Sequence, residues 1–500
     1  MKDKKGVWNV ASGLFFQLLT IGFGLILPRL FILNYGSETN GLISSVGQIY
    51  AYLALLESGI GTASLQALYK AIGHGDQNDI NSILAATHYY YKRIGTIYLV
   101  AIFCLTGIYP IVVQTSIPRF TVAMIVLISG LEGLLSYFFH GKYSILLRAE
   151  GRNYVLNNLN MLLYILSNAA KILLIYLGYD IVVIQLSLFT VSILRIFCLL
   201  SFVRKKNPWI NLSVSPNYEA LSNRKSVLIH KLSNLVFSNT DIIFLTLMCG
   251  LKEVSRYTIY LSFFNMVKSV LFSFLDGIQY KLAQTYHSDF LRFKRMQDSF
   301  EAIYITMTFA LYTILYLLIT PFLRLYTVGI VDIQYVDRFL PILFTFVFLL
   351  QAARGPMQLV TEYAQKFRET QVQSILEMVI NLVVTFIAVI HWGIYGVLIG
   401  TIIALIYRSI AIIWYVDRNI LHKSPWITCK RWGWNAFLFL IISILDRLYP
   451  LTAEKYDILI LKGILAALIV AFLYALALRV FEKEAYNQFR FMLLKRRKTE

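Results

Sequence analysis

Long apolar blocks alternate with short polar segments along the whole chain. A helix needs about 20 apolar residues to cross a bilayer, and fourteen of the blocks reach or approach that length. The pattern therefore predicts an all-α polytopic membrane protein with about 14 transmembrane helices. The predicted spans are 7–33, 41–68, 94–114, 119–146, 154–177, 181–203, 227–249, 255–282, 299–322, 339–364, 371–391, 394–416, 432–449 and 458–480.

Lysine and arginine are concentrated in every second polar segment, on the side of the amino terminus, by roughly four to one. Membrane proteins keep basic residues in their cytoplasmic loops. The asymmetry predicts cytoplasmic amino and carboxyl termini and an even number of spans. The expected location is the bacterial inner membrane.

Composition supports this interpretation and limits the possible functions. Hydrophobic residues make up 58% of the chain, charged residues 15%, and the mean hydropathy is +0.64. Five hundred residues leave no room for a sizeable soluble domain besides these spans. The net charge of +19 follows from the basic loops, so it does not indicate nucleic-acid binding.

No motif of nucleotide, metal or covalent chemistry stands out. The chain lacks the glycine-rich P-loop pattern, and its seven histidines have no metal-ligand spacing. We therefore expect a transporter and not an enzyme, with no cofactor, no metal and no catalytic residues.

Two similar halves flank the longest polar stretch. In each half a short glycine-containing turn follows the first span, and an arginine lies in the last span, at Arg195 and Arg408. Transporters are commonly built from such repeats. The expected domains are an amino-terminal lobe at 1–203, a cytoplasmic linker at 204–226, a second lobe at 227–416, and an extra helix pair with a basic tail at 417–500.

Eleven charged residues fall within the predicted spans. A charge facing lipid near the bilayer centre costs about 2.5–3.5 kcal/mol or more, so such residues normally face a wet cavity or an opposite charge. The basic candidates for a substrate cavity are Arg29, Lys171, Arg195, Lys268, Arg354 and Arg408. The acidic candidates for ion coupling or charge pairing are Glu57, Glu132, Asp241, Asp276 and Glu377.

Two interpretations of these charges remain open. Those near the helix ends, such as Arg29, can instead reach the membrane surface. Of those near mid-span, Glu57 or Glu132 could form a buried ion pair with Arg354. Alternatively, the basic groups bind an anionic substrate while a buried carboxylate binds a coupling ion. The planar guanidinium of arginine suits a diphosphate because it donates two hydrogen bonds at once.

The segment 31–68, FILNYGSETNGLISSVGQIYAYLALLESGIGTASLQAL, resembles the first loop and second helix of polysaccharide exporters of the MOP flippase superfamily. The matching loop residues are Gly36, Glu38 and Gly41, followed by Glu57, Gly59 and Gly61. The segment 146–165 is similar to the connection between that family's fourth and fifth helices. The extra helix pair fits the fourteen-helix branch with the Wzx-type O-antigen flippases and the lipid II flippase.

The resemblance implies two six-helix lobes around a V-shaped cavity and outward movement, by alternating access, of an undecaprenyl-pyrophosphate-linked oligosaccharide for O-antigen, capsule or exopolysaccharide assembly. In that family, basic residues of helices one and eight line the cavity, where this chain has Arg29 and Lys268. Coupling to protons or sodium is also implied. The expected partners are the lipid-linked glycan, membrane lipids and polysaccharide polymerase or assembly proteins.

Two other functions are weighed against this one. A MATE-type exporter of cations or drugs would use acidic cavity residues and would normally end after twelve helices. A membrane glycosyltransferase or polymerase would need a sizeable external loop, whereas the predicted external segments are short.

Overall fold

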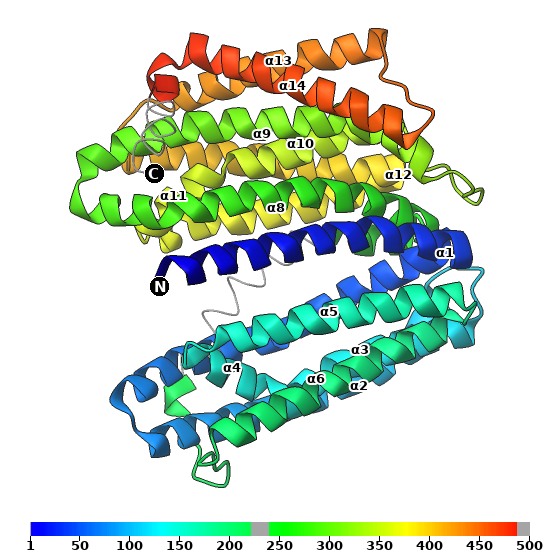
Figure 1. Cartoon of the computed structure of the whole chain (residues 1–500), viewed down its shortest axis with the longest axis vertical. Helices are drawn as coiled ribbons and strands as arrows, with labels where there is room; N and C mark the ends of the chain where they lie inside the picture. Colours follow the sequence, from blue (N-terminus) through cyan, green and yellow to red (C-terminus); the bar gives the residue numbers. More distant parts are fainter. Residues whose placement is uncertain (1, 222–239, 488–500) are drawn as a thin grey trace. The chain divides into compact units, whose positions relative to one another are not determined.

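The computed structural model describes residues 2–221 and 240–487, without the side chains of 2–18, 55, 56, 58, 276, 367 and 368. These residues contain 10 helices that are long and apolar enough to cross a membrane, which confirms an all-helical membrane protein (Figure 1). Two of the 10 helices contain an interior kink, so each is a pair of helices in geometry. Several predicted spans are thereby joined end to end.

The chain divides into two compact units, Met1–Arg256 and Tyr257–Glu500. In the first unit α1 packs against α2, α3, α4 and α5, and α6 packs against α3 and α5. Its helices are α1 (Lys2–His74), α2 (Gln77–Val112), α3 (Arg119–Leu135), a π-helix (Ser136–His140), α4 (Gly141–Ala149), α5 (Asn153–Tyr176), α6 (Ile181–Lys206), a 3-10 turn (Glu219–Leu221) and a helical segment at 240–248.

The second unit is organised around α9, which packs against α10, α11, α13 and α14. Helix α8 begins in the first unit and continues into the second. The helices are α8 (Leu251–Ser288), α9 (Phe290–Tyr326), α10 (Leu340–Ala353), α11 (Gly355–Tyr363), α12 (Phe367–Asn419), α13 (Pro425–Leu448) and α14 (Tyr456–Phe481).

Glycines with positive φ produce the two interior kinks. Gly36 has φ 80° inside α1, where the sequence predicts the turn between the spans 7–33 and 41–68. Gly393 has φ 52° inside α12, between the predicted spans 371–391 and 394–416. Glycine adopts these angles without the clash that a Cβ would cause. Each kink therefore lies where the sequence predicts a turn.

A break in one predicted span sets the position of a buried charge. The sequence predicts a continuous helix over 339–364, but α10 ends at Ala353 and α11 begins at Gly355. Pro356 contributes to this break because it has no backbone N–H to donate. Arg354 lies at the junction and is buried.

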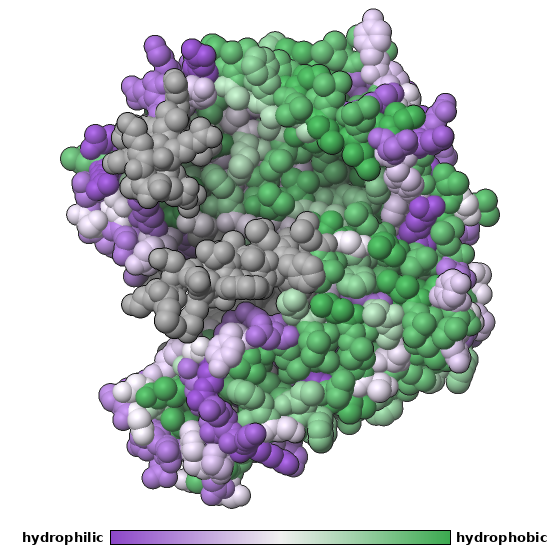
Figure 2. Space-filling model, viewed as in Figure 1, coloured by the Kyte–Doolittle hydropathy of each residue, from purple (hydrophilic) through white to green (hydrophobic). Residues whose placement is uncertain are grey.

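The outer surface is consistent with a bilayer environment. Figure 2 shows hydrophobic residues covering the middle of the helices and hydrophilic residues gathered toward their ends. Large apolar side chains such as Phe120, Phe197 and Ile111 are more than two-thirds exposed. Exposed apolar surface on this scale marks contact with lipid or with other proteins.

We predict that Gly41→Ala destabilises the first unit. A Cβ at Gly41 would overlap the backbone carbonyl oxygen of Leu251, which has no freedom to rotate away. Overpacking of this kind costs about 1–3 kcal/mol. The measurement is the apparent melting temperature of the purified protein in detergent.

Gly47→Ala is the matched control, because it lies in the same part of α1 and a Cβ there meets nothing within 4 Å. We expect it to leave the melting temperature unchanged or slightly higher. Equal melting temperatures for the two variants would show that the close approach of Gly41 to Leu251 is absent in solution.

Candidate functional site

A polar cavity of about 370 Å³ lies among three membrane-spanning helices of the first unit. It contains three of the charged residues that the sequence singles out. Helix α3 carries Glu132, α5 carries Lys171 and α6 carries Arg195. The other polar lining residues are Asn160, Tyr164, Ser167, Asn168 and Ser192.

The charges in this cavity do not fully compensate one another. Two cations face one carboxylate, whose Oε1 accepts a hydrogen bond from Ser192 Oγ at 2.9 Å. Among the described residues, neither Lys171 nor Arg195 lies within 4.0 Å of a carboxylate oxygen. The cavity therefore has a net positive charge and hydrogen-bond donors available to a ligand, which suits an anionic group.

The second unit contains a different arrangement, a buried charge triad. Arg354 Nη1 lies 2.7 Å from Glu377 Oε1, and Arg408 Nε lies 3.5 Å from Glu377 Oε2. Arg408 Nη1 also donates to Gln373 Oε1 at 2.8 Å. All three charged side chains are 8% exposed. The triad is closed to solvent in this conformation, so its evident role here is structural.

The triad differs from the ion pair proposed from the sequence. That hypothesis paired Arg354 with Glu57 or Glu132, whereas Arg354 pairs with Glu377 of α12. Lys268 of α8 is half-buried and lies close enough to Arg354 to be affected by its charge. Lys268 therefore adds a further positive charge beside Arg354.

The remaining predicted charges lie apart from these two groups. Glu57 accepts a hydrogen bond from the Tyr91 hydroxyl at 2.6 Å, and Tyr91 is fully buried. Asp241 is buried on the helical segment 240–248, beside Tyr52. Arg29 is half-buried on α1. The side chain of Asp276 lies outside the described residues.

The predicted loop motif forms a junction at the kink of α1. Glu38 Oε2 accepts hydrogen bonds from Thr115 Oγ1 at 2.7 Å, from Ser116 N at 2.8 Å and from Ser116 Oγ at 2.9 Å. Lys252 Nζ lies 4.0 Å from Glu38 Oε1. Together with Gly36 and Gly41, Glu38 thus connects α1 to the α2–α3 loop and to the start of α8. These contacts account for the motif structurally.

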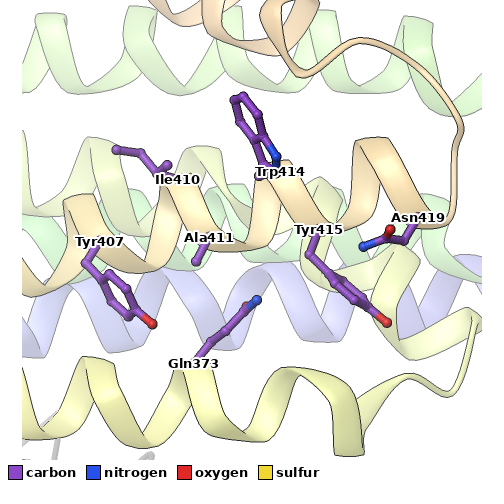
Figure 3. Close-up of a pocket in the computed structure, with 7 residues that line it drawn as sticks. All are labelled: Gln373, Tyr407, Ile410, Ala411, Trp414, Tyr415 and Asn419. Atoms are coloured by element: carbon purple, nitrogen blue, oxygen red, sulfur yellow. The ribbon is translucent and has the colours of Figure 1, made fainter.

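A second hollow lies between the two halves of α12 (Figure 3). Its volume is about 470 Å³, and no charged side chain among those that the structure describes lines it. Gln373 comes from the first half of α12, and the other lining residues come from the second half. Tyr407 and Tyr415 point toward the Gln373 segment, while Trp414 points away from it. The described lining of this hollow therefore offers no charged donor for a diphosphate.

Sequence reasoning missed a dense charge cluster at one end of the second unit. It consists of Asp298, Glu301, Asp417, Lys423, Thr428, Arg431 and Glu482. Lys423 and Arg431 lie in a polar segment before the predicted span 432–449, where the basic residues indicate a cytoplasmic loop, but Arg431 is only 2% exposed. One feature of the sequence could have indicated this cluster. Asp298 and Glu301 are three residues apart, which places their two carboxylates on one face of α9.

Comparison with known proteins establishes the fold. No protein-family model matches the chain, and no curated protein matches it. A solved structure of the lipid II flippase MurJ in an inward closed conformation matches with a TM-score of 0.68 and 14% identity, covering 94% of this chain and 99% of that one.

An inward-facing multidrug resistance MATE family transporter of the MOP superfamily matches with a TM-score of 0.62 and 14% identity, covering 84% of this chain and 95% of that one. The MATE multidrug transporter DinF-BH matches with a TM-score of 0.56 and 14% identity, covering 79% of this chain and 92% of that one. At these identities the likeness concerns the fold, which is therefore MOP-like.

We predict that Glu377→Gln destabilises the second unit by about 3–5 kcal/mol, because it leaves Arg354 and Arg408 buried without a counter-charge. The measurements are the abundance of the protein in membranes and its apparent melting temperature. Glu369→Gln is the control, since Glu369 forms an exposed pair with Lys366 and should tolerate the change. Equal abundance and melting temperature for the two variants would mean that the triad is not needed for stability.

Proposed function

We propose that this chain is a flippase that moves undecaprenyl-pyrophosphate-linked oligosaccharide repeat units across the bacterial inner membrane by alternating access. The translocated repeat units would be used in O-antigen, capsule or exopolysaccharide assembly. The observation that carries this proposal is the cavity in which Lys171 and Arg195 outnumber Glu132 among membrane-spanning helices.

The chemistry of the cavity suits a lipid-linked diphosphate. A diphosphate group brings at least two negative charges, and a buried anion needs charged donors to replace its lost water. The guanidinium group of Arg195 can donate two parallel hydrogen bonds, while the ammonium group of Lys171 provides a point charge. The side chains of Asn160, Ser167 and Asn168 offer further hydrogen-bonding groups to the sugars.

Basic residues of the second unit extend this proposal. We assign Lys268 to substrate binding because it is half-buried on α8 and lies near the positive charge of Arg354. Arg354 and Arg408 are held by Glu377 in the present conformation, so they would contact substrate in another conformation of the transport cycle. Arg29 of α1 completes the set of proposed cavity residues.

The match to a lipid II flippase supports a lipid-linked substrate, since that structure covers 94% of this chain.

A MATE-type cation exporter is the second candidate, supported by the likeness to MATE transporters and by Glu132, which is exposed to the cavity. The two candidates differ in the charge of the ligand. A cation would be repelled by Lys171 and Arg195, so we favour the anionic substrate.

Coupling to a proton or sodium gradient would use a carboxylate within the membrane. We propose Glu132 as the first candidate. When this carboxylate binds or releases an ion, the net charge beside Lys171 and Arg195 would change. Glu57, Asp241, Asp276 and Glu377 are the other candidates.

We also propose that both termini are cytoplasmic and that polysaccharide polymerase or assembly proteins receive the translocated repeat units.

We predict that Lys171→Ala slows transport at least about tenfold, because loss of one charge-assisted hydrogen bond costs roughly 1.5–3 kcal/mol. The assay is translocation of a fluorescent lipid-pyrophosphate oligosaccharide in proteoliposomes, followed with a membrane-impermeant quencher. Lys171→Arg should retain more activity because it keeps the charge.

Lys462→Ala is the control for this assay, since Lys462 is an exposed lysine of α14 outside the cavity. It should transport at the wild-type rate. If wild type moves a cationic dye but not the anionic lipid, the MATE-type function replaces the flippase. If Lys171→Ala loses folded protein in proportion to activity, Lys171 has a structural role.

We predict that Lys268→Ala reduces export of the glycan in cells without reducing the amount of protein in the membrane, and that Lys268→Arg is better tolerated. Removing a cation next to Arg354 relieves repulsion, so the fold should not suffer. The measurements are surface glycan and membrane abundance in the same culture. Parallel loss of both would contradict a role in substrate binding.

A further inference from the structure

Four segments of the second unit meet in the charge cluster that sequence reasoning missed. Helix α9 contributes Asp298 and Glu301, and α12 contributes Asp417 near its end. Lys423 lies in the turn before α13, Thr428 and Arg431 lie on α13, and Glu482 follows α14. This cluster therefore joins the extra helix pair to the rest of the unit.

Arg431 forms bidentate contacts with two of the four carboxylates. Its Nη1 and Nη2 donate to the two oxygens of Asp298 at 2.8 and 2.9 Å. Its Nε and Nη2 donate to the two oxygens of Glu482 at 3.1 and 3.0 Å. Both contacts are bidentate, the geometry in which a guanidinium binds carboxylates most strongly.

Glu301 and Asp417 share the ammonium group of Lys423, and Arg431 Nη1 also lies 3.4 Å from Glu301 Oε1. Lys423 Nζ lies 2.6 Å from Glu301 Oε2 and 3.5 Å from Asp417 Oδ1. Both carboxyl residues are 0% exposed, and Asp417 Oδ1 accepts no hydrogen bond from any described group. Arg431 is also bound to Asp298 and Glu482, so the four carboxylates of the cluster share two cations. Burying the two carboxylates of Glu301 and Asp417 with this deficit of positive charge is costly unless one of them is neutralised.

Thr428 shows where the neutralising group would lie. Its Oγ1 is 2.6 Å from Glu301 Oε1 and 2.9 Å from Asp417 Oδ2. A hydroxyl has one proton, so it can donate to only one of these oxygens. The other short oxygen–oxygen contact is favourable only if that carboxyl group is protonated and donates a hydrogen bond to Thr428 Oγ1.

We propose that the Glu301–Asp417 pair binds a proton, and that this proton holds α13 and the segment after α14 against α9 and α12. A metal ion fits less well, because among residues 2–221 and 240–487 no group of three His, Cys, Asp or Glu side chains is arranged to hold one. The inference is independent of the proposed transport function.

The other titratable groups around the Glu301–Asp417 pair do not explain a change of protonation near neutral pH. Burial favours the neutral form of Lys423, but Glu301 and Asp417 outweigh this effect and raise its pKa above the ordinary value. Lys423 therefore stays charged at neutral pH, as does Arg431. Burial, followed by the negative charge of Asp417, raises the pKa of the Cys429 thiol above its ordinary value. The charged residues that border the cluster are Lys294, Arg295, Lys483 and Glu484.

The direction of the pH effect follows from the charge balance. With the proton bound, three carboxylates face two cations; after its release, four carboxylates face the same two cations. Raising the pH therefore adds an uncompensated buried charge and weakens the contact between α13 and α9. Lowering the pH restores it.

Infrared difference spectroscopy of the full-length protein in nanodiscs tests the proposal, because a protonated carboxylic acid has a carbonyl band that a carboxylate lacks. We expect wild type to lose such a band as the pH is raised from mildly acidic to alkaline. Asp417→Asn should lose this pH-dependent band. Glu219→Gln, which changes an exposed carboxyl outside the cluster, should keep it.

Thr428→Val provides a second test that does not alter either carboxyl. The protonated pair makes two hydrogen bonds through Thr428, whereas the deprotonated pair makes one. Loss of the hydroxyl should therefore shift the midpoint of the band by about one pH unit toward lower pH. Hydrogen exchange of residues 424–435, corrected for intrinsic rates, should rise above the midpoint in wild type.

Three results would overturn the proposal. One is the absence of an acid band from wild type at every pH. Another is a band that persists in both Asp417→Asn and Glu301→Gln, which would place the proton elsewhere. The third is a band whose loss requires sodium instead of a rise in pH, which would make the ligand a metal ion.

Discussion

Charged side chains within the membrane-spanning helices need an opposite charge or access to water, because hydrocarbon offers neither. The second unit satisfies this constraint by pairing, with Arg354 and Arg408 on either side of Glu377. The first unit satisfies it with a cavity, where Lys171 and Arg195 reach open space. The difference separates a structural set of charges from a set that remains available to a ligand.

The same constraint determines how the extra helix pair is attached. Helices α13 and α14 pack on α9, and a cluster of six charges and one hydroxyl joins them at one end. Glu301, Asp417 and Arg431 of this cluster are almost fully buried, and charges buried in this way are stabilising only in good geometry with all partners present. The cluster contains more carboxylates than cations, so its stability depends on a bound proton. The pair is therefore attached by contacts that respond to pH, unlike the apolar contacts elsewhere in the unit.

The sequence predicts the helical class and many helix positions, because a membrane span has a length and a composition that are visible locally. It also predicts the turns at Gly36 and Gly393. It does not predict which helices touch. Glu377 as the partner of Arg354, and the burial of Arg431, both depend on how distant helices pack and rotate. The grouping of Glu132, Lys171 and Arg195 likewise emerges only when α3, α5 and α6 are placed side by side.

The most direct test of the central claim is to delete the gene in its host and determine on which membrane face the undecaprenyl-linked intermediates accumulate. The flippase function predicts complete repeat units on the cytoplasmic face, accessible to reagents only after the membrane is opened. Complete units on the outer face, or a normal lipid pool with altered sensitivity to cationic drugs, would contradict it. The identity of the accumulated glycan would also name the substrate.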